Sequence, residues 1–134
     1  MINIILMAHG NLADEILKTA GGISGLDVSG VHVFSTCCGN DCAVISRQIE
    51  KIFSESADGT LVLSDIFGGS AANVPLQASK GRHDVAILAG LNLSMLLSAL
   101  QHRANMKIAE LTDKVEVDGK RSVINVVQAL KGQY

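Results

Sequence analysis

Charged side chains are scarce in this sequence of 134 residues, where Asp, Glu, Lys and Arg together make up 18%. Soluble domains usually carry roughly 25%. The formal net charge is −2, so the composition lacks the basic excess typical of nucleic-acid-binding proteins, and no nucleic-acid partner is expected. Hydrophobic residues make up 48% of the sequence. With so few charged residues to cover the surface, we expect another subunit or partner to cover part of it.

Cysteine is rare as well, and its three copies, Cys37, Cys38 and Cys42, lie in one short segment. A secreted disulfide framework would use an even number of cysteines spread along the chain. Reduced thiols in a cytoplasmic protein are therefore the simpler interpretation. A zinc site would need a fourth ligand at suitable spacing, and the sequence offers none nearby, so no metal site is predicted.

Long apolar runs are missing too. Residues 2–8 are apolar, but they lack a preceding basic region and are interrupted at once by His9 and Gly10, which excludes a signal peptide. Residues 85–100 are broken by polar residues and glycine and are too short to span a membrane. We therefore expect a cytoplasmic protein, and its length fits a single domain over residues 1–134.

Short apolar runs alternate along the chain with segments of helical periodicity. The runs predict strands at residues 2–8, 31–35, 60–64 and 85–89. Helices are predicted after each strand, the first capped by Asn11 and the second by Asn40 or Asp41. This alternation predicts an α/β fold of three layers, with a mainly parallel sheet covered by helices on both faces.

Two parts of the pattern are less regular. Near the C-terminus, charges alternate with valines over residues 114–117, which predicts a short edge strand, followed by a turn at residues 118–119 and a helix over 123–130. Pro75 is the single proline, and proline is tolerated in the first turn of a helix but not deep inside it. The third helix is therefore expected to begin near Asn73, after a loop.

The residues that follow the strands carry the chemistry. His9 and Gly10 follow the first strand, and Asp65 follows the third. Ligands of parallel sheets bind beyond the carboxyl ends of the strands, where the strand order reverses. If the first and third strands are neighbours there, the carboxylate of Asp65 can accept a hydrogen bond from one imidazole nitrogen of His9. The other nitrogen then keeps its lone pair free as a nucleophile.

An anion site is predicted beside this pair. Gly68, Gly69, Ser70 and Ala71 follow Asp65 closely, and their backbone amides near a helix N-terminus would bind phosphate oxygens, with the Ser70 hydroxyl as one more donor. The segment is not a P-loop, because no Gly-Lys-Ser/Thr follows. Taken singly, each residue has an ordinary structural explanation, such as a tight turn for the glycine pair. Together they describe a phosphohistidine site.

Three blocks of the sequence resemble the mannose-family IIA component of the bacterial sugar phosphotransferase system. They are Ile4-Ile5-Leu6-Met7-Ala8-His9-Gly10, then Asp65-Ile66-Phe67-Gly68-Gly69-Ser70-Ala71-Ala72-Asn73, then Ala89-Gly90-Leu91-Asn92-Leu93-Ser94-Met95-Leu96. The family usually has proline where Ala71 stands here. The resemblance implies that His9 is phosphorylated, that Asp65 orients it, and that Gly68, Gly69, Ser70 and Ala71 hold the phosphoryl group.

The resemblance also implies partners. The donor would be the phosphohistidine protein HPr and the acceptor a histidine on a IIB component, with indirect association to the membrane components IIC and IID. No cofactor is implied. The family forms homodimers that exchange a C-terminal edge strand, and here we expect residues 114–117 to form that strand. Two alternatives remain at this point. One is the phosphoryl-transfer subunit of a dihydroxyacetone kinase, whose block usually lacks the Gly-Gly-Ser run. The other is a phosphorylation-dependent regulatory module.

Overall fold

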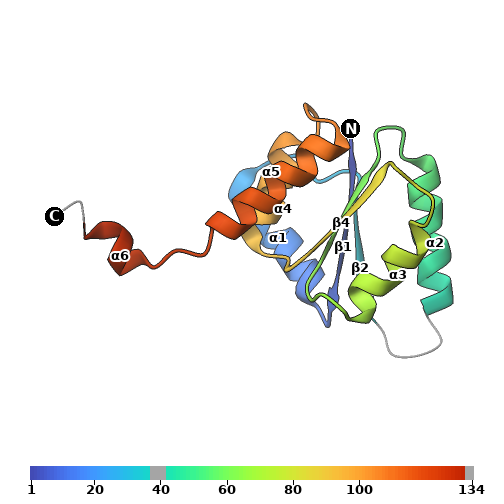
Figure 1. The fold of residues 1–134 in the computed structure, drawn as a ribbon, viewed down its shortest axis with the longest axis horizontal. Coiled ribbons are helices and arrows are strands. Elements are labelled where there is room, and N and C mark those ends of the chain that lie inside the picture. Colours follow the sequence, from blue (N-terminus) through green and yellow to red (C-terminus); the bar gives the residue numbers. More distant parts are fainter. Residues whose placement is uncertain (37–41, 132–134) are drawn as a thin grey trace.

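Four parallel strands form the central sheet of the protein. The computed structural model describes residues 1–36 and 42–131, without the side chains of residues 70 and 71. The strands are β1 (Asn3–His9), β2 (Val31–Thr36), β3 (Thr60–Ser64) and β4 (Val85–Ala89), in the order β2-β1-β3-β4 (Figure 1). All four predicted strands are confirmed. The chain crosses from β2 past β1 to β3, so the strand order reverses between β1 and β3.

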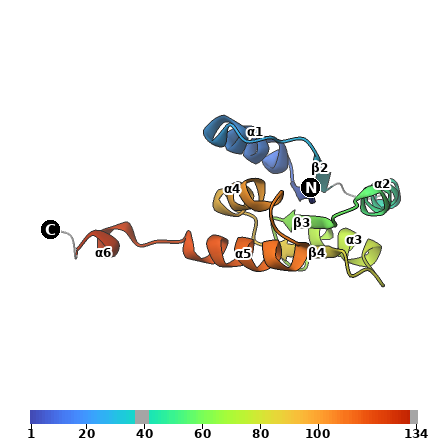
Figure 2. The ribbon, with the colours of Figure 1, turned by 90° about the horizontal axis from the view of Figure 1, so that it is seen from above.

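The two faces of the sheet bury alternate residues of β1 against different helices. Ile4, Leu6 and Ala8 face a cluster built with α1 (Leu12–Ser24), α4 (Leu93–His102) and α5 (Ile108–Arg121). Ile5 and Met7 face a smaller cluster with α2 (Cys42–Glu55) and α3 (Ser70–Ala78). Figure 2 shows these two helix groups on either side of the strands. The predicted three-layer α/β architecture is therefore confirmed.

The third helix begins earlier than the proline predicted. Helix α3 starts at Ser70, and the expected loop before Asn73 is wrong. The carbonyl of Gly69 accepts hydrogen bonds from the amides of Ala72 and Asn73, at 3.1 and 3.0 Å, which forms the first turn ahead of Pro75. Pro75 lies inside this helix, where it removes the bond that its own nitrogen would have donated to the carbonyl four residues earlier.

The predicted edge strand at 114–117 and the turn at 118–119 are both wrong, because α5 runs through them. Leu111, Val115 and Gly119 are buried at a spacing of four residues, which places them on one face of a helix. The alternating charges pair along the helix instead. Lys114 contacts Asp118, and Glu116 contacts Lys120, each four residues apart.

The chain beyond α5 extends away from the body of the molecule (Figures 1 and 2). The predicted helix over 123–130 is confirmed only in part, as the short α6 (Val126–Leu130), which buries no side chain. Among the residues that the structure describes, no strand follows β4. Within the same residues, no helix is long and apolar enough to cross a membrane.

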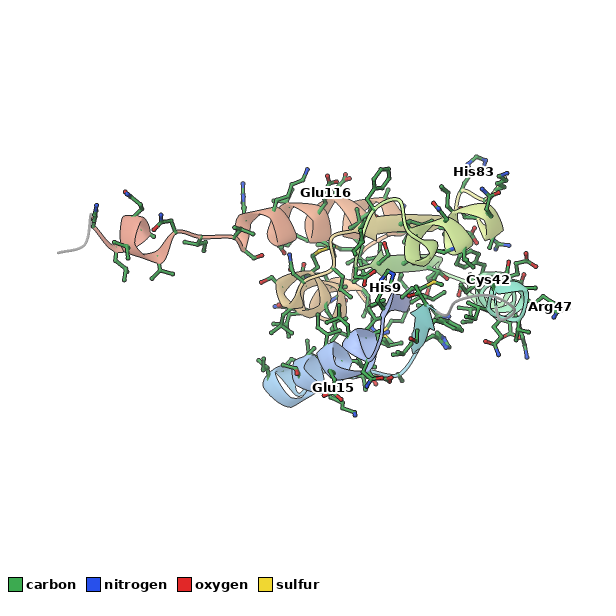
Figure 3. The ribbon with its side chains drawn as sticks, turned by 90° about the horizontal axis from the view of Figure 1, so that it is seen from below. His9, Glu15, Cys42, Arg47, His83 and Glu116 are labelled. Atoms are coloured by element: carbon green, nitrogen blue, oxygen red, sulfur yellow. The ribbon has the colours of Figure 1, made fainter. Side chains whose placement is uncertain are left out.

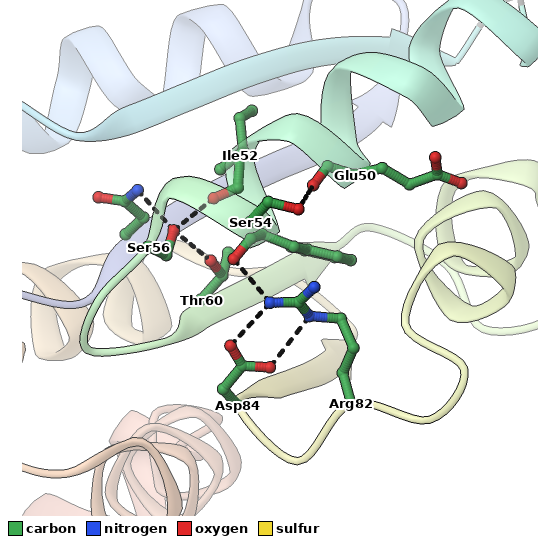
Figure 4. Close-up of polar contacts among 9 residues, drawn as sticks. Glu50, Ile52, Ser54, Ser56, Thr60, Arg82 and Asp84 are labelled. Atoms are coloured by element: carbon green, nitrogen blue, oxygen red, sulfur yellow. Dashed lines mark hydrogen bonds and ion pairs between the residues drawn. The ribbon is translucent and has the colours of Figure 1, made fainter.

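Polar contacts tie the amino ends of the strands to α2 (Figure 4). The guanidinium of Arg82 donates to both carboxylate oxygens of Asp84, just before β4, and to the carbonyl of Phe53 in α2 at 2.8 Å. The Ser56 hydroxyl accepts hydrogen bonds from the Asn3 amide and the Thr60 hydroxyl. Structural contacts therefore close this end of the sheet.

Gly119 lies inside α5 because another helix approaches it closely. An added Cβ would lie 2.4 Å from Cγ and 3.1 Å from Sδ of Met95 in α4. We expect Gly119→Ala to lower the free energy of unfolding by about 1 kcal/mol, since overpacking costs about 1–3 kcal/mol and outweighs the helix propensity gained. Urea denaturation at one protein concentration measures the change.

Gly22→Ala is the matched control, because it also replaces a helical glycine but nothing lies within 4 Å of its added Cβ. This variant should gain about 0.5–1 kcal/mol from the better helix former. Stabilisation of both variants alike would contradict the close contact between α4 and α5.

Candidate active site

His9 and Asp65 meet at the carboxyl edge of the sheet. His9 is the last residue of β1, and Asp65 directly follows β3, whose Ser64 pairs in register with Met7. Nδ1 of the His9 ring lies 2.8 Å from Oδ2 of Asp65. Because an ionised carboxylate can only accept, Nδ1 carries the proton and Nε2 keeps its lone pair. As predicted, the first and third strands are neighbours in the sheet, and the His9 ring is paired with the Asp65 carboxylate.

The carboxylate of Asp65 is held on both oxygens. Its Oδ2 also accepts the backbone amide of His9 at 2.9 Å, and its Oδ1 accepts the amide of Ile66 at 2.9 Å. Burial acts to raise the pKa of Asp65, but the hydrogen bonds from the amide and ring of His9 outweigh it and hold that pKa below its ordinary value. Asp65 is therefore an ionised, fixed acceptor at neutral pH.

The side chain of His9 is far more exposed to solvent than that of Asp65. The His9 side chain is 56% exposed, whereas that of Asp65 is 9% exposed. The carboxylate is thus shielded and the ring is open to solvent. Figure 3 shows His9 at the end of β1, with His83 well away from it. The ring can therefore meet a reactant that approaches from outside the molecule.

The glycine segment lies against the ring, as predicted. A Cβ added to Gly69 would lie 3.8 Å from Cε1 of His9, and α3 begins at the next residue. Gly68 has φ +87°, a left-handed conformation that side chains rarely adopt. The first amides of a helix have no partner inside it and attract anions. The side chains of Ser70 and Ala71 lie outside the described residues, so their contacts stay predictions.

Three supporting contacts were not predicted from the sequence. The Ser35 hydroxyl of β2 donates to the carbonyl of Gly10 at 2.9 Å, which fixes the turn after His9. Asn92 caps α4 by accepting the amide of Met95. Its own amide donates to the carbonyl of Gly119 at 3.4 Å. Asn92 thus organises helices. Asn92 lies in the sequence block 89–96 that carried the family resemblance, so the sequence offered a signal for it. The Ser35 contact depends on the register between β1 and β2, which the sequence does not give.

The cysteines do not extend this site within the described residues. Cys42 is a free, half-buried thiol at the start of α2, and the predictions for Cys37 and Cys38, like the caps Asn40 and Asp41, lie outside the described residues. Over residues 1–36 and 42–131, no three His, Cys, Asp or Glu side chains gather closely enough to hold a metal ion. The site therefore combines an imidazole oriented by a carboxylate with the N-terminus of a helix beside it.

Comparison with known proteins gives consistent matches. Residues 3–116 match the family described as PTS system fructose IIA component. A phosphotransferase system component EIIA from Streptococcus agalactiae is 30% identical, with a TM-score of 0.85 over 96% of this chain and 99% of that one. The mannose/sorbose specific IIA subunit from Enterococcus faecalis is 27% identical, with a TM-score of 0.79 over 92% and 93%.

A third solved structure shares the fold at lower identity. The PTS IIA protein associated with the fucose utilization operon from Streptococcus pneumoniae is 24% identical, with a TM-score of 0.81 over 96% of both chains. No curated protein gives a significant match.

The tautomer of His9 is open to a direct test with Asp65→Asn. The asparagine keeps the shape of the side chain but offers an amide donor, which would favour the tautomer with the proton on Nε2. Long-range ¹H–¹⁵N NMR spectra should therefore show Nδ1 protonated in the unaltered protein and a shift toward protonated Nε2 in the variant. Identical ring spectra in both proteins would mean that Asp65 does not select the tautomer.

Proposed function

The chain belongs to the family of PTS system fructose IIA components, and on that premise we propose that it is a phosphocarrier whose His9 accepts a phosphoryl group and passes it on. The membership confirms the predicted resemblance to the mannose-family IIA component and supports a phosphotransfer role in sugar uptake. The observation that carries the proposal is the His9 ring, which is oriented through Nδ1 by Asp65 and belongs to a side chain that is 56% exposed.

The reaction we propose is a direct transfer between two histidines. The lone pair on Nε2 of His9 attacks the phosphorus carried by phospho-HPr, an N–P bond forms on Nε2, and the N–P bond to the donor imidazole breaks. The ring of His9 gains positive charge as the phosphoryl group arrives, and the ionised Asp65 stabilises that charge through Nδ1–H. No proton has to leave Nε2.

The backbone around Gly68 and Gly69 has the second role in this proposal. The helix N-terminus at Ser70 would bind the phosphoryl oxygens, with the Ser70 hydroxyl and the amide of Ala71 as further donors. Amides stabilise the anionic oxygens without donating a proton to the N–P bond. The phosphoryl group would then stay transferable.

The second transfer would reverse these steps. A histidine of a IIB component attacks the phosphorus on His9, and Nε2 leaves with its lone pair restored. We place this cycle in the cytoplasm, with the membrane components IIC and IID reached only through IIB.

Asp65→Asn should slow the first transfer on the order of 10²-fold, less than the loss of an orienting acid costs a hydrolase, because no proton must be removed from the nucleophile.

The labelling test uses His9→Gln. With phosphoenolpyruvate, enzyme I and HPr, the unaltered protein should acquire acid-labile phosphate, whereas His9→Gln should acquire none while its thermal unfolding is unchanged. His83→Gln is the matched control, since His83 is exposed and precedes β4 at the opposite end of the sheet. Labelling that survives in His9→Gln would refute the assignment of the phosphorylated residue.

We also propose a homodimer, on the basis of the C-terminal arm. The apolar side chains of Val123, Ile124, Val126 and Val127 are 60–86% exposed, and such side chains gain from burial against a second copy. Strand β4 pairs only with β3 among the described strands, so its other edge is free. A cavity of about 430 Å³ lies beside it, lined by residues that include Gly90, Lys120 and Val123.

Analytical sedimentation measures whether the protein is a monomer or a dimer. At micromolar concentration we expect a dimer whose interface buries more than roughly 2,000 Å² in total. Ending the chain at Arg121 removes the arm and should give a monomer that keeps the sheet and α5. A full-length monomer at that concentration, or a dimer that survives the truncation, would contradict the proposal.

A further inference from the structure

A hydroxyl group without a hydrogen-bond partner lies in the strand next to His9. Oγ1 of Thr36, the last residue of β2, is buried and makes no hydrogen bond within residues 1–36 and 42–131. Buried polar side chains nearly always have a partner, and leaving one without a partner costs free energy. The protein without a phosphoryl group therefore carries a hydrogen-bond donor that the described part of its fold does not use.

The sheet register places Thr36 beside His9. The two residues are partners across β2 and β1, and neighbouring strands lie about 4.8 Å apart. They also share a face of the sheet, because side chains alternate along a strand. Met7, two residues before His9, packs in the cluster formed with α2 and α3. Phe34, two residues before Thr36, packs in the same cluster. Thr36 and His9 therefore lie on that face, at the carboxyl ends of their strands.

The orientation of the His9 ring puts Nε2 on the side of the ring where β2 lies. Nδ1 is hydrogen-bonded to Asp65, which follows β3. In an imidazole the bond between Cδ2 and Nε2 lies opposite Nδ1, so this edge of the ring points away from Asp65. Strand β1 lies between β3 and β2 in the sheet. Thr36 is therefore on the side of the ring that carries Nε2.

We propose that the Thr36 hydroxyl donates a hydrogen bond to the phosphoryl group when His9 carries it. This inference rests on the proposed function. A phosphoryl group on Nε2 brings anionic oxygens to the side of the ring where β2 lies, and such oxygens accept hydrogen bonds strongly. Thr36 as a whole is half-buried. A rotation about its χ1 angle exchanges the hydroxyl with another position on Cβ and can bring it to the phosphoryl group.

This contact acts on one state of the protein only. Without a phosphoryl group, the hydroxyl of Thr36 costs free energy because it is buried and has no partner among the described residues. With the phosphoryl group present, a charge-assisted hydrogen bond stabilises the phosphohistidine. Thr36 therefore determines how far transfer from HPr runs toward this protein. It does not select the tautomer of His9, which is the role of Asp65.

The test measures both states in Thr36→Val, which keeps the shape of the side chain and removes the hydroxyl. Before phosphorylation, the variant should unfold at the same temperature as the unaltered protein or at a higher one, because it lacks the unpaired hydroxyl. The equilibrium of phosphoryl transfer should shift about tenfold toward phospho-HPr, since a hydrogen bond to a charged group is lost. The ³¹P NMR signal of phosphorylated His9 should also shift. Thr36→Ser, which keeps a hydroxyl, should restore the equilibrium.

Ser64→Ala is the matched control. Oγ of Ser64 is also buried without a partner among the described residues, but Ser64 pairs with Met7, two residues before His9 on β1. At about 3.3 Å per residue, this hydroxyl lies deeper in the sheet than that of Thr36. Ser64→Ala should therefore leave the transfer equilibrium and the ³¹P signal unchanged.

Three results would overturn the proposal. They are an unchanged equilibrium in Thr36→Val, a marked loss of stability in that variant before phosphorylation, and an equal shift of the equilibrium in Ser64→Ala. The second result would mean that the hydroxyl serves the fold itself. If His9 of the unaltered protein acquires no phosphate from phospho-HPr, the proposed function fails, and the role of Thr36 fails with it.

Discussion

The hydrogen bond between Nδ1 of His9 and Oδ2 of Asp65 is the interaction around which the open end of the sheet is organised. It determines which ring nitrogen is free, and it joins two strands that are far apart in the sequence. It needs β1 and β3 side by side, and it needs the carboxylate to be ionised and immobile. The backbone amides of His9 and Ile66 meet the second requirement by occupying both oxygens. These contacts also explain why the pKa of Asp65 stays low despite burial.

The rest of the architecture positions this pair. Alternate residues of β1 are buried against two different helix layers, so the strand that ends in His9 is fixed from both faces. Helix α3 begins at Ser70 and brings its N-terminus to the ring, and this start depends on the carbonyl of Gly69 closing the first turn. The amino end of the sheet is closed by Arg82 and Ser56. The His9–Asp65 pair lies at the opposite, carboxyl edge.

The surface of the protein divides in the same way. Near His9 the described rim is apolar and nearly uncharged, with Phe67 most exposed of its large apolar side chains. At the far side, α5 and the arm beyond it expose valines and an isoleucine next to the free edge of β4. The second of these surfaces is the one proposed to meet a second copy.

Local signals in the sequence determined the strands, because short, mostly apolar runs that alternate with helical periodicity are typical of strands buried in a covered parallel sheet. They also placed His9, Asp65, Gly68 and Gly69 at strand ends, which in a parallel sheet means the same edge. Only the tertiary structure decided what happened where local rules conflicted. Gly119 and the charges of residues 114–117 signalled a turn and a strand, but close contact with Met95 needs a glycine inside a helix. Pro75 signalled a late helix start, but the two bonds to the Gly69 carbonyl formed the turn first. The distances at the site and the exposure of Phe67 likewise depend on how distant segments pack, which no local pattern encodes.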